Sequence, residues 1–323
     1  MKIGTSQETL DAIPVFYTEK MVADSECYSP SAGKPIAVMA AWQELGIPLT
    51  VYEPLPVSTK QLEYAHEHEY VSDVLACRTS NGFGNRSAAI ARSLPYTSGA
   101  MLSAAREAIA NGRVAAAPCS GFHHAGFSHG GGFCTFNGLM VTAMTLINEG
   151  VVSRVGIIDF DQHWGDGTHN IIKQLGVTKQ VRHYHPYMDF RGNYDAPRFL
   201  RELPSIIEQF ADCDVVLYQA GADPHIDDPL GGWLTTRELQ RRDYLTFRKL
   251  AELGIPVAWN LAGGYQRDAR DSIRPVLEIH ENTMNECARI YLGRQTGEAT
   301  RAVLSSDRIR VTDQSRKDIE LCG

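Results

Sequence analysis

The sequence predicts an α/β fold in which a parallel sheet lies between two layers of helices. Short apolar runs typical of buried strands alternate with longer segments whose apolar residues recur every three or four positions, as on one face of a helix. Strands separated by helices pair in parallel, and helices then cover both faces of the sheet. No internal repeat, low-complexity stretch or charge block divides the 323 residues, so we expect one domain comprising residues 1–323.

This periodicity places the individual elements. Apolar runs predict buried strands at residues 114–118, 155–158, 215–218 and 256–261. Helical spacing predicts helices at residues 35–44, 98–110, 139–149, 204–210, 236–253 and 273–292. Thr235 is a suitable N-cap for the fifth of these helices, with Glu238 in its first turn. Helices are expected to end at Gly150, Gly176 and Gly254.

Three segments fall outside this pattern. Residues 79–92 are rich in turn-forming residues and predict a surface loop near the mouth of the site. The basic cluster at residues 237–242 is expected on a solvated helix face. From about residue 296 the chain becomes polar, and a short strand is predicted at residues 308–311, before a charged tail.

Composition excludes several classes of protein. No apolar run reaches the roughly 20 residues that span a bilayer, and the N-terminus lacks the apolar region of a signal peptide, so we expect a cytoplasmic protein without a membrane partner. A net charge of −7 disfavours nucleic acid as a direct partner. The seven cysteines are spaced irregularly and predict free thiols rather than a zinc ribbon or a disulfide framework.

Ionisable residues follow the predicted strands. Asp161 and His163 come directly after the strand at 155–158 and are two residues apart, so an extended backbone points both side chains to one side. Asp223 follows the strand at 215–218. Parallel sheets place their chemistry at the carboxyl ends of strands. If these three residues converge on one cation, they leave a position open for water and substrate, which favours catalytic hydrolysis of an amide or ester.

Residues suited to proton transfer follow the other strands. The pair His123 and His124 is a candidate general base, with Asp159 and Asp166 as carboxylates behind the imidazoles. Tyr265, after two glycines, is a candidate donor to the oxyanion of a tetrahedral intermediate. Each motif alone also fits a turn or a helix cap, but their joint occurrence at successive strand ends favours an active site.

These motifs resemble the zinc-dependent histone deacetylase superfamily, which includes acetylpolyamine amidohydrolases and acetoin-utilisation proteins. The similarity runs in family order from about residue 100 to 270. It comprises His123-His124-Ala125, residues 132–137, Asp159-x-Asp161-x-His163-x-Gly165-Asp166-Gly167, Gly221-Ala222-Asp223 with Asp228-Pro229, and Gly263-Gly264-Tyr265.

The resemblance implies the arginase/deacetylase fold, with a mainly parallel sheet of about eight strands, and one zinc ion. It implies that the metal ligands are Asp161, His163 and Asp223. By the same resemblance, His124 with Asp166 is the general base and acid, His123 with Asp159 is mainly electrostatic, and Tyr265 polarises the substrate carbonyl. The implied substrate-binding residues are Gly132, Phe133, Phe190 and Leu230. The expected substrate is an acylated lysine side chain or a small acylated amine.

Departures from the family pattern refine these expectations. Trp164 replaces a second His after the ligand His. Arg182 or His183 stands where relatives have a Ser at a monovalent-cation site, which disfavours potassium. Leu230 replaces the Glu that favours polyamines in some relatives, so we favour acyl-lysine, with an acetylpolyamine amidohydrolase as the alternative.

Other readings remain. An arginase-like ureohydrolase needs a second metal ion, but Gly165 occupies the position of a carboxylate that such a site requires. A non-catalytic acyl-lysine binding module would not need the proton-transfer residues. Iron(II) remains an alternative to zinc, since two carboxylates and one imidazole select weakly between these ions. The oligomeric state, including a homo-oligomer, is left open.

Overall fold

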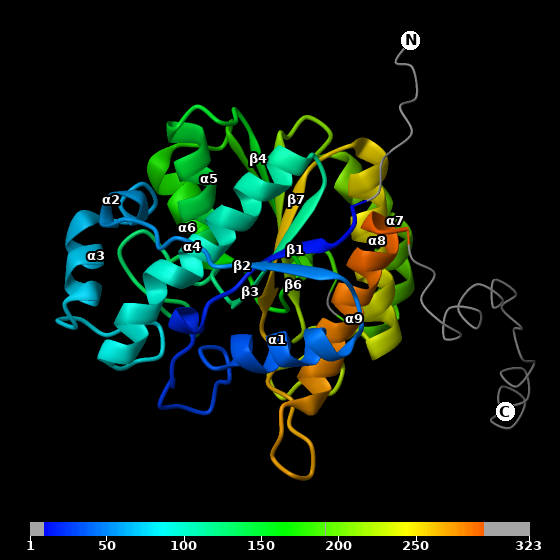
Figure 1. Cartoon of the computed structure of the whole chain (residues 1–323), viewed down its shortest axis with the longest axis horizontal. Helices are drawn as coiled ribbons and strands as arrows, with labels where there is room; N and C mark the ends of the chain where they lie inside the picture. The colour runs from blue at the N-terminus through cyan, green and yellow to red at the C-terminus, as the bar shows by residue number, and fades with distance from the viewer. Residues whose placement is uncertain (1–9, 191, 294–323) are drawn as a thin grey trace, which may run out of the picture.

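A seven-stranded sheet crosses the centre of the computed structural model, which describes residues 10–190 and 192–293 (Figure 1). All neighbouring strands pair in parallel, in the order β2-β1-β3-β7-β6-β4-β5. The strands are β1 (Ile13–Phe16), β2 (Leu49–Tyr52), β3 (Val114–Ser120), β4 (Val155–Asp159), β5 (Val181–Tyr184), β6 (Val215–Gly221) and β7 (Val257–Ala262). The predicted three-layer fold is confirmed, with seven strands in the described residues where the resemblance implied about eight.

Helices cover both faces of the sheet (Figure 1). One face is covered by α2 (Thr59–Leu62), α3 (His68–Leu75), α4 (Ala88–Asn111), α5 (Gly138–Asn148) and α6 (Asp166–Leu175). The other face is covered by α1 (Lys34–Glu44), α7 (Ala196–Glu208), α8 (Thr236–Leu253) and α9 (Arg274–Tyr291). Short 3-10 turns are η1 (Glu19–Met21), η2 (Pro186–Met188) and η3 (Asn193–Asp195).

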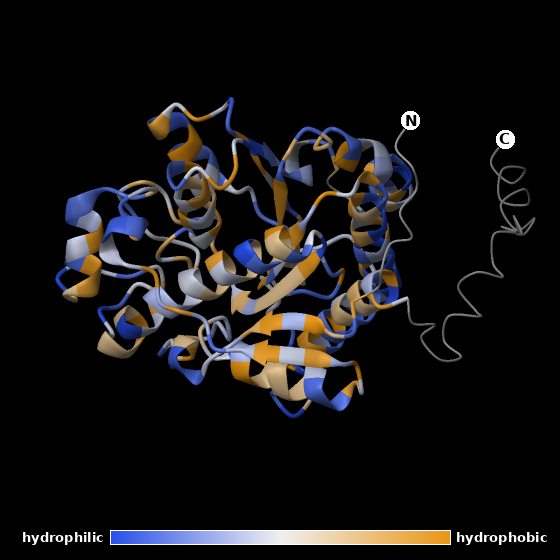
Figure 2. Ribbon diagram, turned by 45° about the horizontal axis from the view of Figure 1, so that its top comes forward, coloured by the Kyte–Doolittle hydropathy of each residue, from blue (hydrophilic) through white to orange (hydrophobic). Residues whose placement is uncertain are grey.

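The sheet divides the apolar interior into two clusters. Along β6, Val215 and Leu217 pack with the α4 side, whereas Val216 and Tyr218 pack with the α8 side. This alternation follows from the two-residue period of a strand, and it explains why the central strands are continuous apolar runs. The strands appear largely hydrophobic in Figure 2, while the helices mix hydrophobic and hydrophilic positions. No described helix is long and apolar enough to cross a membrane.

Most predicted elements lie within a few residues of the observed ones. Helix α8 has the predicted bounds, and Thr235 and Glu238 form its capping box. Two helices begin earlier than predicted. Each contains a proline, and because proline usually marks a helix boundary, the prediction started both helices too late. Helix α4 begins at Ala88 and continues through Pro95, so the predicted loop at residues 79–92 is wrong in its last five positions. Helix α7 likewise begins at Ala196, before Pro204.

Several short elements were not predicted. Strands β1, β2 and β5 have four residues each and lie at or near the edges of the sheet. Because they are short and not buried on all sides, none of them has the long apolar run that would predict a strand. Helices α2, α3 and α6 were also missed, although Gly176 does end α6, as the sequence indicated. The strand predicted at residues 308–311 and the tail from 296 lie outside the described residues.

The basic cluster on α8 is not wholly solvated, because Arg242 is fully buried. Its Nη1 atom donates to the carbonyl oxygens of Phe160 at 3.2 Å and Gly221 at 2.8 Å. Its Nε atom donates to Asp243 Oδ1 at 2.9 Å. Asp243 also accepts hydrogen bonds from the hydroxyls of Tyr218 and Thr283. Arg242 therefore ties together the chain directly after β4 and the end of β6.

We predict that Arg242→Met destabilises the protein by about 3–5 kcal/mol, because it leaves Asp243 buried without its cationic partner. The measurement is urea-induced unfolding. The matched control is Arg241→Met, which alters the adjacent, exposed arginine and should change the free energy of unfolding by less than about 0.5 kcal/mol. Equal effects of the two substitutions would contradict a bracing role for Arg242.

Candidate functional site

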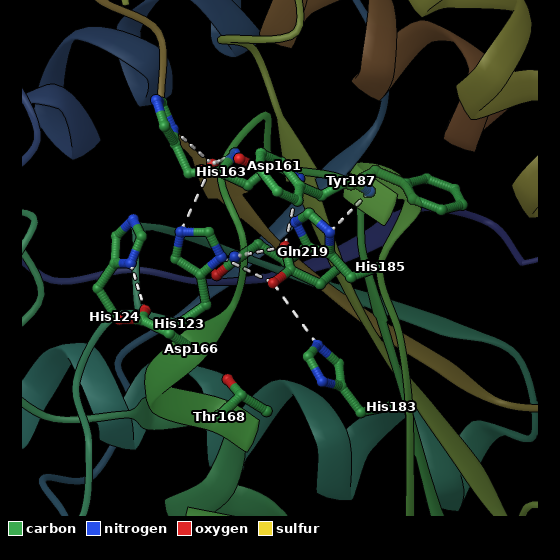
Figure 3. A network of polar contacts seen from close by, with 12 residues as sticks. His123, His124, Asp161, His163, Asp166, Thr168, His183, His185, Tyr187 and Gln219 are labelled. Atoms are coloured by element: carbon green, nitrogen blue, oxygen red, sulfur yellow. Dashed lines mark hydrogen bonds and ion pairs between the residues drawn. The ribbon is translucent and has the colours of Figure 1, made fainter. Parts of the chain in front are cut away.

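The predicted site residues gather beyond the carboxyl ends of four neighbouring strands, β3, β7, β6 and β4. His123 and His124 follow β3, Asp161 and His163 follow β4, Asp223 follows β6, and Tyr265 follows β7. Because parallel strands all end at the same edge, residues far apart in sequence become neighbours there. Figure 3 shows the imidazoles of His123, His124 and His163 close to Asp161 and Asp166.

Asp161, His163 and Asp223 form a group suited to a metal ion, with one candidate ligand atom from each residue within 4.8 Å of the others. His163 Nδ1 lies 3.1 Å from Asp161 Oδ1 and 2.9 Å from Asp223 Oδ2. Both carboxylates are buried, so their oxygens face this imidazole rather than bulk water. Two oxygens and one nitrogen around a buried, electron-rich point fit a divalent cation such as zinc.

The electrostatics of this group reflect the crowding of its charges. Hydrogen bonding to Asp161 and Asp223 raises the pKa of His163 to about 11. Burial, together with the charge of Asp161, raises the pKa of Asp223 to about 8. In the absence of a cation the group therefore retains protons that ligation would displace.

Each histidine of the His123-His124 pair contacts its own carboxylate. His123 Nδ1 lies 2.7 Å from Asp159 Oδ2. His124 Nδ1 lies 2.6 Å from Asp166 Oδ1, as Figure 3 shows. The two rings are 4.1 Å apart between centroids. Asp159 ends β4, and Asp166 lies in the first turn of α6. A carboxylate at Nδ1 fixes each ring so that its Nε2 atom is left for chemistry.

The two imidazoles differ in their affinity for protons. Burial opposes a charge on His123, but the carboxylates of Asp159 and Asp161 raise its pKa to about 9. Burial and the neighbouring charge of His123 lower the pKa of His124, against the pull of Asp166. Without a bound cation, the first ring is therefore charged at neutral pH, whereas the second is neutral and able to accept a proton.

Two further histidines, which the sequence did not assign to the site, surround Asp159. His183 Nε2 lies 3.7 Å from Asp159 Oδ2, and Arg182 instead pairs with Asp212 at the surface. His123, Asp159 and His185 also form a compact group. However, His185 Nδ1 accepts a hydrogen bond from the Tyr187 backbone at 2.9 Å, so Nε2 of a neutral ring carries the proton. In this tautomer His185 has no free ring nitrogen for a cation, and the Nε2 atoms of His183 and His185 make no hydrogen bond to the described residues.

Tyr265 lies in the same pocket as the imidazoles. Gly263 and Gly264 have φ angles of 49° and 88°, a conformation that favours glycine, and they turn the chain after β7. The Tyr265 backbone nitrogen donates to Asp228 Oδ2 at 2.8 Å, while Asp228 Oδ1 accepts from the Leu230 nitrogen at 3.0 Å. Burial and the charge of Asp223 raise the pKa of Tyr265, so its phenol remains a hydrogen-bond donor.

A pocket with about 260 Å³ of space, including the solvent at its mouth, lies among these groups. It is lined by His123, His124, Asp161, His163 and Tyr265, together with Gly132 and Phe133 from the predicted substrate-binding set. Gly132 must remain small, because a Cβ there would lie 2.4 Å from the His124 ring. The Phe133 ring lies 5.6 Å from the Tyr265 ring.

The other two predicted substrate-binding residues lie elsewhere. Phe190 is only 3% exposed and packs against Phe199 and Trp233, so it does not face Phe133 across this pocket. Leu230 is 39% exposed and is not part of the pocket lining. Tyr28 also lies outside the lining, but it is next to two lining residues, with its ring 5.3 Å from that of Phe133 and 6.4 Å from that of Tyr265.

Tyr28 and Lys34 are residues near the site that sequence reasoning missed. Lys34 is almost fully buried, and its Nζ atom donates to the carbonyl oxygen of Gly263. Burial lowers the pKa of Lys34 to about 8. Both residues precede or begin α1, far in sequence from the strand-end motifs, and no local pattern marks them.

The sequence profile of the histone deacetylase domain matches residues 32–194, about half of the chain. The chain belongs to the histone deacetylase domain family. This superfamily includes histone deacetylases and acetylpolyamine amidohydrolases. The buried Asp/His group described above is suited to a metal ion, as the motifs predicted.

Relatives with different names share this histone deacetylase domain. An uncharacterised protein of Picosynechococcus is 29% identical over 70% of this chain and 82% of its own length. Histone deacetylase 2 of Arabidopsis thaliana is 29% identical over 49% of this chain and 46% of its own. Acetylpolyamine amidohydrolase 2 of Pseudomonas aeruginosa is 26% identical over 44% of this chain and 48% of its own. The matched part thus spans about half the length of the two named enzymes.

A solved structure confirms the fold of this histone deacetylase domain. The HDA15 HD domain superposes with a TM-score of 0.67 at 22% identity, covering 87% of this chain and 91% of that chain. At this identity the likeness establishes the architecture rather than a substrate.

We predict that the affinity of the apo-protein for zinc increases at least tenfold between pH 6.5 and 8.5. The pKa values of Asp223 and His163 are raised, so both groups hold protons at the lower pH and must release them before they can bind a cation. Competition with a chromogenic chelator measures the affinity. An affinity that is constant or falls over this range would contradict the assignment of these bound protons to Asp223 and His163.

Proposed function

We propose that the protein is a zinc-dependent amidohydrolase that removes acetyl or related acyl groups from acyl-lysine or a similar N-acyl amine. The observation that carries this proposal is the convergence at one pocket of two imidazole-carboxylate pairs, a group suited to a cation and the half-buried phenol of Tyr265. Membership of the histone deacetylase domain family supports the same class of reaction.

In this proposal Asp161, His163 and Asp223 hold the metal ion. Zinc, when bound, polarises the substrate carbonyl and makes a water molecule easier to deprotonate. Iron(II) also suits this ligand set, because carboxylate oxygens and imidazole select weakly between the two metals. The fit rests on the donor set and on the burial of both carboxylates.

His124 is the proposed general base, followed by general acid. Its lowered pKa keeps the ring neutral, and Asp166 at Nδ1 stabilises the imidazolium that forms when Nε2 takes a proton from the attacking water. The same proton can then pass to the nitrogen of the departing amine. Asp159 raises the pKa of His123, so this ring keeps its proton and contributes mainly a fixed positive charge.

Tyr265 is the proposed donor to the substrate's carbonyl oxygen. Its phenol is protonated at any pH near neutrality, and the bond from its backbone nitrogen to Asp228 fixes the turn that carries it. A donor held in position before the reaction stabilises the negative charge that develops on that oxygen.

The aromatic rings of Phe133 and Tyr28 are the proposed walls for the alkyl stem of the substrate amine. They meet edge to face beside Tyr265, and Tyr28 is 62% exposed, so the two rings lie between the pocket and solvent. Gly132 leaves room beside His124. Phe190 is too deeply buried for the role implied by the resemblance, and Leu230 can act only from outside this pocket.

Two competing functions are disfavoured by specific contacts. For an arginase-like site, a Cβ at Gly165 would lie 2.7 Å from Asp159 Oδ2, which leaves no space for a further carboxylate ligand. A module that only binds acyl-lysine would have no use for two imidazole-carboxylate pairs with opposite pKa shifts. Acetylpolyamine hydrolysis remains the second candidate, because relatives of both kinds share the domain.

The test is hydrolysis of a fluorogenic acetyl-lysine peptide and of N-acetylputrescine by protein reconstituted with one equivalent of zinc. Turnover of the peptide that is lost on chelation and restored by zinc supports a lysine deacylase. Turnover of acetylputrescine alone supports the polyamine alternative. If neither amide is hydrolysed by zinc-loaded or iron-loaded protein, the proposal is wrong.

We predict that Tyr265→Phe lowers kcat for the peptide by about 10²–10³-fold while zinc remains bound, because one carbonyl donor is removed. Steady-state kinetics and zinc analysis of the same samples are the measurements. Tyr64→Phe, which removes a hydroxyl from a half-buried tyrosine outside the pocket, is the matched control and should keep normal kcat. Unchanged kcat in Tyr265→Phe would rule out its proposed role.

We predict that Tyr28→Ala raises KM for the peptide about tenfold with a small change in kcat, because the substrate's stem loses an apolar wall far from the reacting carbonyl. Tyr28→Phe keeps the ring and should restore a normal KM. The role would be refuted by a Tyr28→Ala enzyme with unaltered KM, or by a loss in kcat alone.

A further inference from the structure

Tyr28, the proposed wall at the mouth of the pocket, lies on a loop held mainly by polar contacts. This loop comprises residues 24–31, and a backbone hydrogen bond of 3.1 Å between the two residues that flank it closes its base. Within this fully described loop, no buried side chain is apolar. Its interior contains Ser25, whose hydroxyl donates to the Ser29 carbonyl oxygen at 2.8 Å. The loop therefore has little apolar burial of its own to fix its position.

Two hydrogen bonds tie the loop to other parts of the chain. Asn85 Nδ2 donates to the carbonyl oxygen of Ser25 at 2.9 Å. Arg267 Nη2 donates to the carbonyl oxygen of Tyr28 at 3.3 Å. The first bond holds the beginning of the loop, whereas the second holds the peptide group of Tyr28 itself. Because Tyr28 is 62% exposed, the place of its ring depends largely on the backbone that Arg267 holds.

The turn that carries Arg267 holds its guanidinium ready for this contact. Nη1 donates to the carbonyl oxygen of Asp271 at 2.8 Å and lies 3.5 Å from Asp271 Oδ1. The Asp268 carboxylate closes the turn by accepting from the nitrogens of Arg270 and Ser272 at 2.8 and 2.9 Å. A guanidinium can donate to two carbonyl oxygens at once, because its five N–H groups have a fixed planar geometry.

Stability alone does not explain this arrangement. The ion pair of Arg267 with Asp271 is exposed, and exposed pairs contribute little to stability. The hydrogen bond to the Tyr28 carbonyl instead connects two segments that are far apart in sequence. Arg267 also follows Tyr265 by two residues, so one segment carries both the proposed carbonyl donor and the anchor of the proposed wall.

We propose that Arg267 is a positioning residue, whose guanidinium holds the Tyr28 carbonyl so that the Tyr28 ring stands beside Phe133 and Tyr265 before the substrate binds. The effect on turnover rests on the proposed function, whereas the hold on the loop does not. A wall fixed in advance loses less conformational freedom when the substrate binds, so the guanidinium acts on KM rather than on kcat.

The first experiment measures KM and kcat for the acetyl-lysine peptide with zinc-loaded Arg267→Met. Fixing one side chain in advance favours binding by about twofold to tenfold, so we expect KM to rise within this range, with kcat changed by less than about twofold. Arg267→Lys keeps the charge but supplies a point donor in place of the planar fork, and should give an intermediate KM.

The matched control is Arg270→Met, which alters another exposed arginine of the same turn and should keep a normal KM, because only its backbone takes part in the contacts described. A normal KM in Arg267→Met, an equal rise in both variants, or a loss in kcat alone counts against the inference.

A double variant separates positioning from direct contact with the substrate. If Arg267 acts only through Tyr28, Arg267→Met should raise KM by less than about 1.5-fold in a Tyr28→Ala background, because the effects of coupled residues are not additive. A rise of the same size in both backgrounds would mean that the guanidinium acts on the substrate itself, and the positioning role would be wrong.

Hydrogen exchange of the zinc-loaded protein without substrate separates this inference from the proposed function. Amide exchange in residues 24–31 should be at least about fivefold faster in Arg267→Met than in wild type or Arg270→Met, because the loop opens more often when one tie is removed. If no amide is hydrolysed but exchange increases in this way, the proposed function fails and the hold on the loop stands. If the peptide is hydrolysed but exchange is equal in all three proteins, the positioning role fails alone.

Discussion

The burial of like charges at one point is the constraint on which this structure depends. Asp161 and Asp223 are both buried, and burial together with the charge of Asp161 raises the free energy of ionising Asp223. The negative charge of their oxygens is partly compensated by the His163 imidazole. In addition, the His163 backbone nitrogen donates to Asp161 at 2.9 Å, and the Gln162 backbone nitrogen donates to Asp223 at 3.3 Å. Such an arrangement is stable only if the surrounding backbone is held rigidly, since relaxation would separate the charges.

The rigid support comes from the sheet and from α8. In β4 and β6, Asp159 is the register partner of Gln219, whose side chain donates to it at 2.8 Å. The parallel register places the chain ends after these strands side by side, and Arg242 binds a carbonyl oxygen at each end. The two acidic ligand candidates, Asp161 and Asp223, thus belong to segments that the Arg242 guanidinium joins. The same contacts therefore stabilise both the fold and the site.

The sequence predicted the parts of this architecture that depend on local pattern. Apolar runs located the four central strands, and the ionisable residues after them do converge. What it could not predict are features created by tertiary contact. Arg242 lies in a run of charges that looks solvated, and only the packed helix shows it buried. Phe190 was expected beside Phe133, but the structure places Tyr28 there, because the paths of their loops decide which ring lies next to Phe133.

The two oxygens of Asp228 have a consequence for how the site can evolve. One accepts from the Leu230 backbone and the other from that of Tyr265, so a single carboxylate joins the outer loop to the turn carrying the carbonyl donor. A shift of either segment displaces the other. Under the proposed function, a mutation that moves the loop at Leu230 would therefore also move Tyr265 and change turnover.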